Sequence, residues 1–128
     1  MKQVLLLDDN PAQLLVRELV LRKGGVETHV ATNSQSALAF LRSAPGQEKI
    51  GVVVTDHIMP GMDGAEFVRQ LRSFNPDIPV IVISGMAEAE QEYADLSVIF
   101  RTKPCEPEDL IALVRSTLSR NPRNRASA

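Results

Sequence analysis

The 128-residue sequence predicts an α/β sandwich in which one mainly parallel, five-stranded sheet lies between helices. Short apolar runs alternate with amphipathic stretches along the chain, and each connection is long enough to hold a helix. Hydrophobic residues make up 44% of the chain, which is enough for one packed core. Both observations favour a single doubly wound domain.

The strand patterns also predict the order of the strands. The first, third and fourth runs are continuously apolar, as in parallel strands that are covered on both faces, whereas the second and fifth alternate, as at sheet edges. With right-handed crossovers, these edges predict the flavodoxin-like order 2-1-3-4-5 with helices on both faces. The predicted strands are residues 4–7, 26–32, 50–54, 79–83 and 98–102.

Helical spacing and helix-breaking residues mark the helices between these strands. The first begins at Pro11, and its apolar residues Leu15, Val16 and Leu19 recur at helical spacing. Pro45 and the glycine after it are expected to end the second. The predicted helices are residues 11–23, 34–44, 64–74, a weaker stretch at 87–94, and 107–118.

Composition bounds the domain organisation and the partners. Residues 1–120 are expected to form one domain, and residues 121–128 a flexible tail or linker stub. A net charge of −2 with interspersed signs argues against a nucleic-acid-binding surface. No apolar run reaches the length of a membrane span, so neither nucleic acid nor membrane is expected as a partner. The single cysteine, Cys105, excludes an internal disulfide, and a cytoplasmic location is the default.

Polar side chains stand where the predicted strands end. The first strand ends at Asp8-Asp9, the third at Asp56, the fourth at Ser84 and the fifth at Lys103. Ligands of open parallel sheets bind beyond the carboxyl ends of the strands. We therefore expect these carboxylate, hydroxyl and ammonium groups to meet at one rim.

Clustered carboxylates disfavour one another's ionisation, so a compensating cation is expected. Oxygen ligands in small number suit Mg²⁺ or Mn²⁺. Asp9 is the expected direct ligand and Asp8 a water-mediated one, with Asp56 and the backbone carbonyl of Ile58 completing the set. The alternative is that Asp8 and Asp9 merely cap the first helix.

Asp56 is also the candidate nucleophile, because carboxylates form aspartyl phosphates in phosphotransfer. A transferring phosphoryl group spreads charge over its oxygens, which the cation, Lys103 and the Ser84 hydroxyl are placed to neutralise. Gly85 would leave the approach to Asp56 open. His57, on the loop, is predicted to be a surface or packing residue rather than a base.

Four ordered elements resemble the signature of response-regulator receiver domains of two-component systems, in particular chemotaxis receivers. The similarity covers about residues 3–118. The elements are Asp8-Asp9, residues 56–64 (DHIMPGMDG), Ser84-Gly85 and Lys103-Pro104, each at a strand end.

The resemblance implies Mg²⁺-dependent transfer of a phosphoryl group to Asp56 from a sensor histidine kinase or phosphotransfer protein. On this basis the chain is not expected to be an enzyme that acts on other molecules; it would catalyse only its own phosphorylation and dephosphorylation. Ser84 and Phe100 would form a conformational switch, and the alternative role for Phe100 is core packing. A cis Lys103-Pro104 bond, an unidentified downstream protein and dimerisation on phosphorylation are further implications.

The sequence departs from the family in three places. The stretch between Ser84 and Lys103 is short, which puts the fourth helix in doubt. Ile58 and Met86 are apolar where polar residues can orient water, which predicts slow loss of the phosphoryl group. Cys105 replaces an aromatic residue and has no assigned function.

Other functions remain open. One is a degenerate receiver that binds proteins independently of phosphorylation. Another is a phosphohydrolase with an aspartyl nucleophile, which is disfavoured because its acidic pair would be separated by one residue and follow the first strand. A stand-alone receiver and a fragment of a hybrid kinase or longer regulator are both compatible with the sequence.

Overall fold

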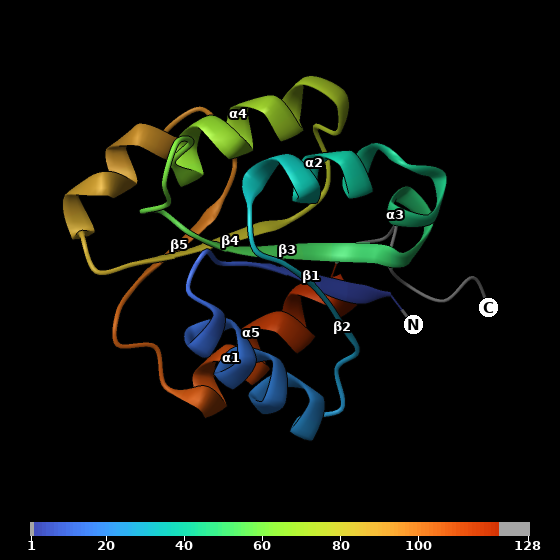
Figure 1. The fold of residues 1–128 in the computed structure, drawn as a ribbon. Helices are drawn as coiled ribbons and strands as arrows, with labels where there is room; N and C mark the ends of the chain where they lie inside the picture. Colours follow the sequence, from blue (N-terminus) through green and yellow to red (C-terminus); the bar gives the residue numbers. More distant parts are fainter. Residues whose placement is uncertain (1, 121–128) are drawn as a thin grey trace.

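The computed structural model, which describes residues 2–120, is built on one five-stranded parallel sheet (Figure 1). The strand order is β2-β1-β3-β4-β5, so the predicted fold class and strand order are confirmed. The strands are β1 (Gln3–Leu7), β2 (Thr28–Ala31), β3 (Ile50–Asp56), β4 (Val80–Ser84) and β5 (Ile99–Thr102).

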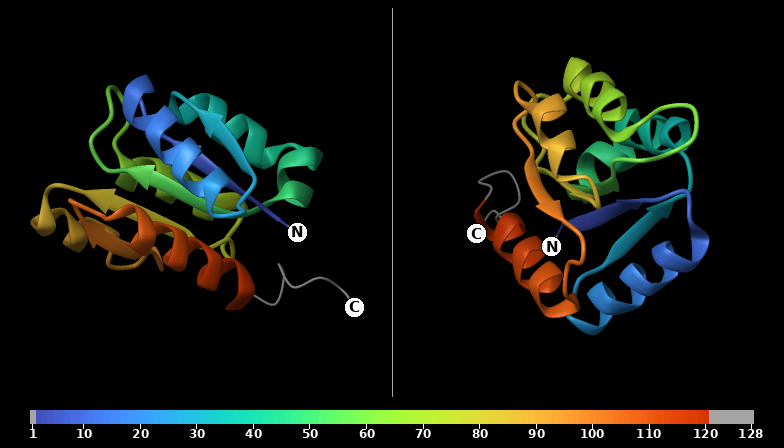
Figure 2. Two further views of the ribbon diagram at one scale, coloured as in Figure 1. Left: turned by 90° about the horizontal axis from the view of Figure 1, so that it is seen from below. Right: turned by 90° about the vertical axis from the view of Figure 1, so that its left-hand side faces the viewer.

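Helices cover both faces of the sheet. In Figure 1, α2, α3, α4 and the 3₁₀ helix η1 lie above the sheet, and α1 and α5 lie below it. Figure 2 shows the same two layers from below and from the side. The helices are α1 (Pro11–Lys23), α2 (Ser34–Arg42), α3 (Ala44–Lys49), α4 (Gly64–Phe74), η1 (Ala87–Tyr93) and α5 (Pro107–Arg120).

The sheet carries a hydrophobic cluster on each face. Leu5, Leu7 and Val53 join the cluster under α2 and α4, whereas Val4 and Leu6 join the cluster over α1 and α5. Successive side chains of a strand point to opposite faces, so strands covered on both sides need apolar residues at every position. This requirement explains the continuous apolar runs of β1, β3 and β4.

Asn10 is the residue that caps α1. Its side chain accepts hydrogen bonds from the backbone N–H groups of Ala12 and Gln13, and Pro11 occupies the first turn. Asp8 precedes this cap and accepts the backbone N–H of Asn10 at 2.9 Å. Asn10 therefore caps α1, and helix capping does not explain why two aspartates, Asp8 and Asp9, precede it.

Two predicted helices differ from those observed. Pro45 and Gly46 do not end the second helix. α2 stops at Arg42, and these residues lie in the short helix α3, whose cap is the Ser43 hydroxyl. The weak helix predicted at residues 87–94 is the 3₁₀ helix η1. The expected tail at residues 121–128 lies outside the described residues.

The apolar residues that predicted α1 are not the ones that it buries. Leu15, Val16 and Leu19 are more than half exposed, while Leu14 and Leu21 enter the core. α1 therefore presents an apolar face to the outside. Within residues 2–120, the search for a helix that could cross a membrane finds none.

Candidate functional site

Strand register brings the predicted site residues to one edge of the sheet. The last paired residues of β1 and β3 lie opposite each other, so Asp8 follows β1 beside Asp56. Ser84, the last residue of β4, pairs with the last residue of β5, so Lys103 follows directly beside it. The predicted convergence of these four side chains at the carboxyl ends of the strands is what the register produces.

Asp56 is buried and holds the centre of this edge. It is 5% exposed, and its Oδ1 lies 3.1 Å from the Nζ of Lys103. A small cavity of about 50 Å³ opens beside it, lined in part by Ile58, Ser84 and Gly85. The carboxylate is thus paired with a cation and still faces a space.

Ser84 and Phe100 lie on the side of the site that faces η1. The Ser84 hydroxyl accepts the backbone N–H of Met86 at 3.0 Å, and the Ser84 carbonyl accepts the Lys103 N–H at 2.8 Å. Phe100 is half-buried, and its ring centroid lies 5.8 Å from that of Tyr93. Phe100 therefore packs against η1 in this structure.

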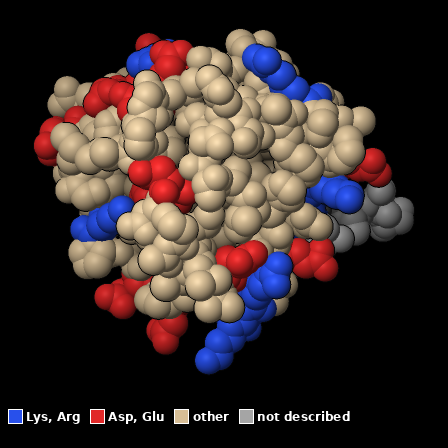
Figure 3. Space-filling model, in the orientation of Figure 1, with Lys and Arg blue, Asp and Glu red and all other residues tan. Residues whose placement is uncertain are grey.

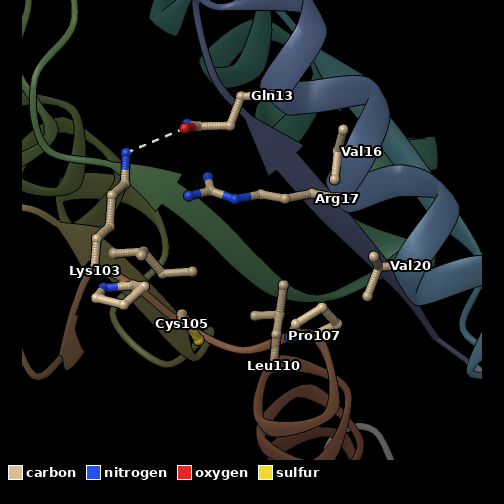
Figure 4. Close-up of a pocket in the computed structure, with 10 residues that line it drawn as sticks. Gln13, Val16, Arg17, Val20, Lys103, Cys105, Pro107 and Leu110 are labelled. Atoms are coloured by element: carbon tan, nitrogen blue, oxygen red, sulfur yellow. Dashed lines mark hydrogen bonds between the residues drawn. The ribbon is translucent and has the colours of Figure 1, made fainter.

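Two residues that the sequence analysis missed enter the site from α1. The Nε2 of Gln13 donates to Asp8 and, at 2.6 Å, to Asp56, and the Oε1 of Gln13 accepts the Nζ of Lys103 at 3.3 Å. The guanidinium of Arg17 lies 3.4 Å from Asp8 and 3.3 Å from Asp56. Figure 4 shows both side chains projecting from α1 towards Lys103.

A signal for these two residues was present. Gln13 and Arg17 are four positions apart on the helix that follows Asp8 directly, so they share one face. Their reach to Asp56, more than thirty-five positions away, depends on how α1 packs on the sheet.

Burial gives Asp8 an unusual electrostatic position. It is 1% exposed. Burial, followed by the neighbouring Asp56, raises the pKa of Asp8 above its ordinary value, while the Asn10 N–H and Gln13 act in the opposite direction. Ionisation of Asp8 therefore costs desolvation free energy, which its hydrogen bonds offset only in part.

The other two predicted metal ligands are more exposed than Asp8 and Asp56. Asp9 is exposed, and Ile58, whose backbone carbonyl is the predicted ligand, is 64% exposed and lines the small cavity beside Asp56. In the described part of the chain, the only three ligating side chains whose donor atoms lie within 4.8 Å of one another are His57, Asp63 and Glu92. The metal-binding roles of Asp8, Asp9, Asp56 and the Ile58 carbonyl stay predictions.

His57 is a buried packing residue. It is 5% exposed, its Nδ1 lies 2.7 Å from the Tyr93 hydroxyl, and its Nε2 lies 3.3 Å from Glu92. Of the two alternatives from the sequence, packing is confirmed and a surface position is wrong. Burial, followed by Asp63 and Glu92, raises the pKa of Tyr93, so the hydroxyl stays protonated.

The segment after Lys103 borders a second, larger cavity. The Lys103-Pro104 bond is cis, as the resemblance implied. Cys105 is half-buried, and burial raises the pKa of its thiol. The cavity, of about 490 Å³, lies between α1 and the start of α5 and is lined in part by Arg17, Cys105 and Leu110 (Figure 4).

The chain matches the response regulator receiver domain family over residues 4–115. It is 33% identical over 120 residues to sensor kinase CckA of Brucella abortus, covering 91% of this chain and 12% of that protein. It is 31% identical over 120 residues to the probable transcriptional regulatory protein TcrX of Mycobacterium tuberculosis, covering 91% of this chain and 50% of that protein. The chain thus spans half or less of the length of these two relatives.

The fold is also similar to a solved structure. The receiver domain of the Francisella response regulator 1452 superposes with a TM-score of 0.83 at 26% identity, covering 94% of this chain and 98% of that one.

Proposed function

The chain belongs to the response regulator receiver domains of two-component systems, and from that premise we propose that it accepts a phosphoryl group on Asp56 with a divalent cation bound beside it. The observation that carries the proposal is the contact between Asp56 and Lys103, whose charged atoms lie 3.1 Å apart beside a small cavity. A carboxylate that is buried, paired with an ammonium and still reachable is suited to nucleophilic attack on a phosphoryl group.

The proposed transfer forms one bond and breaks one. One oxygen of Asp56 attacks the phosphorus of a phosphohistidine, forming a P–O bond as the P–N bond breaks. The imidazole nitrogen of the donor leaves with the bonding pair and takes a proton from solvent. The ammonium of Lys103 neutralises a phosphoryl oxygen, and the Ser84 hydroxyl reaches another after leaving the Met86 N–H.

The chemistry of the donors at the rim fits a hard cation. Asp8 and Asp56 both accept from the Nε2 of Gln13 and both lie beside the guanidinium of Arg17, so their carboxylates face a common space, and Asp9 follows Asp8 directly in the chain. Mg²⁺ or Mn²⁺ would be held by Asp9, Asp8, Asp56 and the Ile58 carbonyl and would neutralise charge on the transferring group. The raised pKa of Asp8 supports this, because a buried carboxylate gains most from a cation.

Receiver domains interact with sensor kinases, and the outer face of α1 supports a docking position for such a donor here. Leu15, Val16 and Leu19 are 53%, 59% and 58% exposed. They lie on the helix that carries Gln13 and Arg17 into the site. An exposed apolar patch beside a reactive group suits a protein that must bring its phosphohistidine to Asp56.

Phosphorylation would then be read out through η1 and β5. A hydroxyl that turns from the Met86 N–H towards the phosphoryl group leaves space that Phe100, now packed on Tyr93, can enter. The downstream partner would be a protein that distinguishes the two arrangements. A cytoplasmic location belongs to the same proposal.

Intact mass spectrometry after incubation with acetyl phosphate and Mg²⁺ tests the acceptor. We expect the protein to gain one phosphoryl group and Asp56→Asn to gain none. Asp63→Asn is the matched control, because it removes a carboxylate from the same rim, keeps the helix cap of α4, and should still be modified. Modification of Asp56→Asn would overturn the assignment. An unmodified wild-type protein that binds its partners normally would favour the phosphorylation-independent binding module.

A further inference from the structure

Arg17 makes contacts that a solvated helix arginine would not make. Its side chain is 12% exposed, and its two terminal nitrogens lie 3.4 Å from Asp8 and 3.3 Å from Asp56. A guanidinium is seldom buried unless it is paired, and its planar fork suits two acceptors at once. Arg17 therefore bridges the two carboxylates that are predicted to serve the cation.

The charges of the pocket are balanced by side chains. Two carboxylates, Asp8 and Asp56, face two side-chain cations, Arg17 and Lys103. A divalent ion at the same oxygens would leave an excess of positive charge as long as Arg17 stayed. If Arg17 withdraws and Asp9 joins the site, three carboxylates face Lys103 and one divalent ion, and the balance is restored.

A cavity next to Arg17 could accept its side chain away from the two carboxylates. The cavity of about 490 Å³ lies on its other side, with Val16, Val20 and Leu110 among its lining residues (Figure 4). The methylene stem of an arginine packs well along such side chains while its head reaches water. Arg17 can leave the carboxylates by changing its own rotamers, without movement of α1.

We propose that Arg17 is a positioning residue that competes with the divalent cation for Asp8 and Asp56. In the metal-free protein it holds the acidic pocket together, and it must withdraw before the cation binds. The affinity of the receiver for its cation is therefore lower than that of the same carboxylates without Arg17. This inference rests on the proposed function, since it concerns the same site, and it adds a residue that sets when the site can be used.

Binding of Mn²⁺, followed by electron paramagnetic resonance of the free ion at constant ionic strength, tests the competition. We expect Arg17→Met to bind Mn²⁺ about tenfold more tightly than the wild-type protein, within the usual range of coupling between two sites. Arg17→Gln is a second neutral variant in case the first folds poorly. Arg17→Lys restores the charge and should return the affinity most of the way to that of the wild type.

Arg22→Met is the matched control. It removes the same charge from the same helix, but Arg22 is largely exposed and pairs with Glu18 instead of the site. Its affinity should stay within about twofold of the wild type, because exposed charges are screened. A change equal to that of Arg17→Met would mean that net charge alone acts, and it would overturn the proposal.

Two further results would also overturn it. One is an unchanged or weaker Mn²⁺ affinity in both neutral variants, and the other is the absence of Mn²⁺ binding by the wild type. Phosphorylation of the wild type by acetyl phosphate, measured in the same samples, separates the two proposals. Normal phosphorylation with unchanged Mn²⁺ affinities would contradict only the role of Arg17.

Discussion

At the scale of single residues, Asp8 is the carboxylate of the site whose pKa is raised by burial. It is 1% exposed, and burial together with Asp56 raises its pKa. The folded state therefore holds the Asp8 proton more tightly than the unfolded chain does. Its contribution to stability is greatest below the ordinary value of 3.8 and is lost as the pH rises through the folded pKa.

Replacing Asp8 by Asn should stabilise the metal-free protein at neutral pH. Asn removes the buried charge and keeps an acceptor for the Asn10 N–H. We expect the free energy of unfolding to rise by about 1 kcal/mol and the Tm by roughly 3–5 °C. Urea unfolding in the presence of a chelator measures the change.

Asp9→Asn is the control, since Asp9 is exposed and carries the same charge. It should leave the free energy of unfolding almost unchanged in the absence of metal. A metal-free protein that is less stable with Asn at position 8 would show that Arg17 and Gln13 more than compensate for burial of the carboxylate.

Other residue-scale features show what the sequence could and could not reveal. Asp56, Ser84 and Lys103 were predictable because each stands at the end of a predicted strand, and strand ends of a parallel sheet share an edge. The role of Arg17 was not predictable, because an arginine on a helix is expected to be solvated unless the packing angle of that helix is known. His57 was left between surface and core, because its neighbour Tyr93 belongs to a segment without clear periodicity.

At the scale of secondary-structure elements, η1 contacts the loop after Asp56 through Tyr93 and Glu92, which both lie beside His57. The Tyr93 hydroxyl contacts His57 at 2.7 Å, and the same ring packs on Phe100. A Cβ added to Gly64 would lie 2.4 Å from that hydroxyl, so the start of α4 approaches Tyr93 closely. These contacts connect the residue after Asp56 to the predicted switch.

Tyr93→Phe should loosen η1. The buried His57 loses a hydrogen-bond partner, which typically costs about 1–2 kcal/mol. Amides of residues 87–96 should then exchange roughly tenfold faster with solvent, while those of β3 keep their rates. Hydrogen exchange followed by NMR measures both.

Glu92→Gln gives the comparison, because Glu92 contacts the other nitrogen of His57 but its side chain is 45% exposed. A partly exposed polar contact contributes little, so exchange in η1 should hardly change. Equal effects of both substitutions would contradict a special role for the Tyr93 hydroxyl.

The elements also differ in how well the sequence defined them. The bounds of α4 were predicted as observed, because a capping residue and a strong apolar face mark it. The existence of α1 was predicted but not its buried face, since Leu15, Val16 and Leu19 have core-like spacing yet lie outside. The helix α3 was missed because Pro45 normally marks an ending, whereas here it lies in the first turn of a new helix.

At the scale of the whole molecule, the fold supplies the site as a consequence of its topology. Continuous apolar runs indicated the central strands, and alternating runs indicated the edge strands. This distinction was enough to predict the observed strand order. Positive and negative side chains are interspersed over the face drawn in Figure 3, without one continuous patch of either sign. A partner that binds this face should therefore recognise local features and not a large charged patch.

A crystal structure of the protein with Mg²⁺ and beryllofluoride, a mimic of the phosphoryl group, tests the central claim most directly. We predict beryllium bonded to an oxygen of Asp56, with Lys103 and Ser84 contacting its fluorides. We also predict Mg²⁺ held by Asp9, Asp8 and Asp56, with Arg17 withdrawn from both carboxylates. Beryllofluoride on another carboxylate, or an Asp56 that stays free at saturating Mg²⁺ and beryllofluoride, would contradict the account.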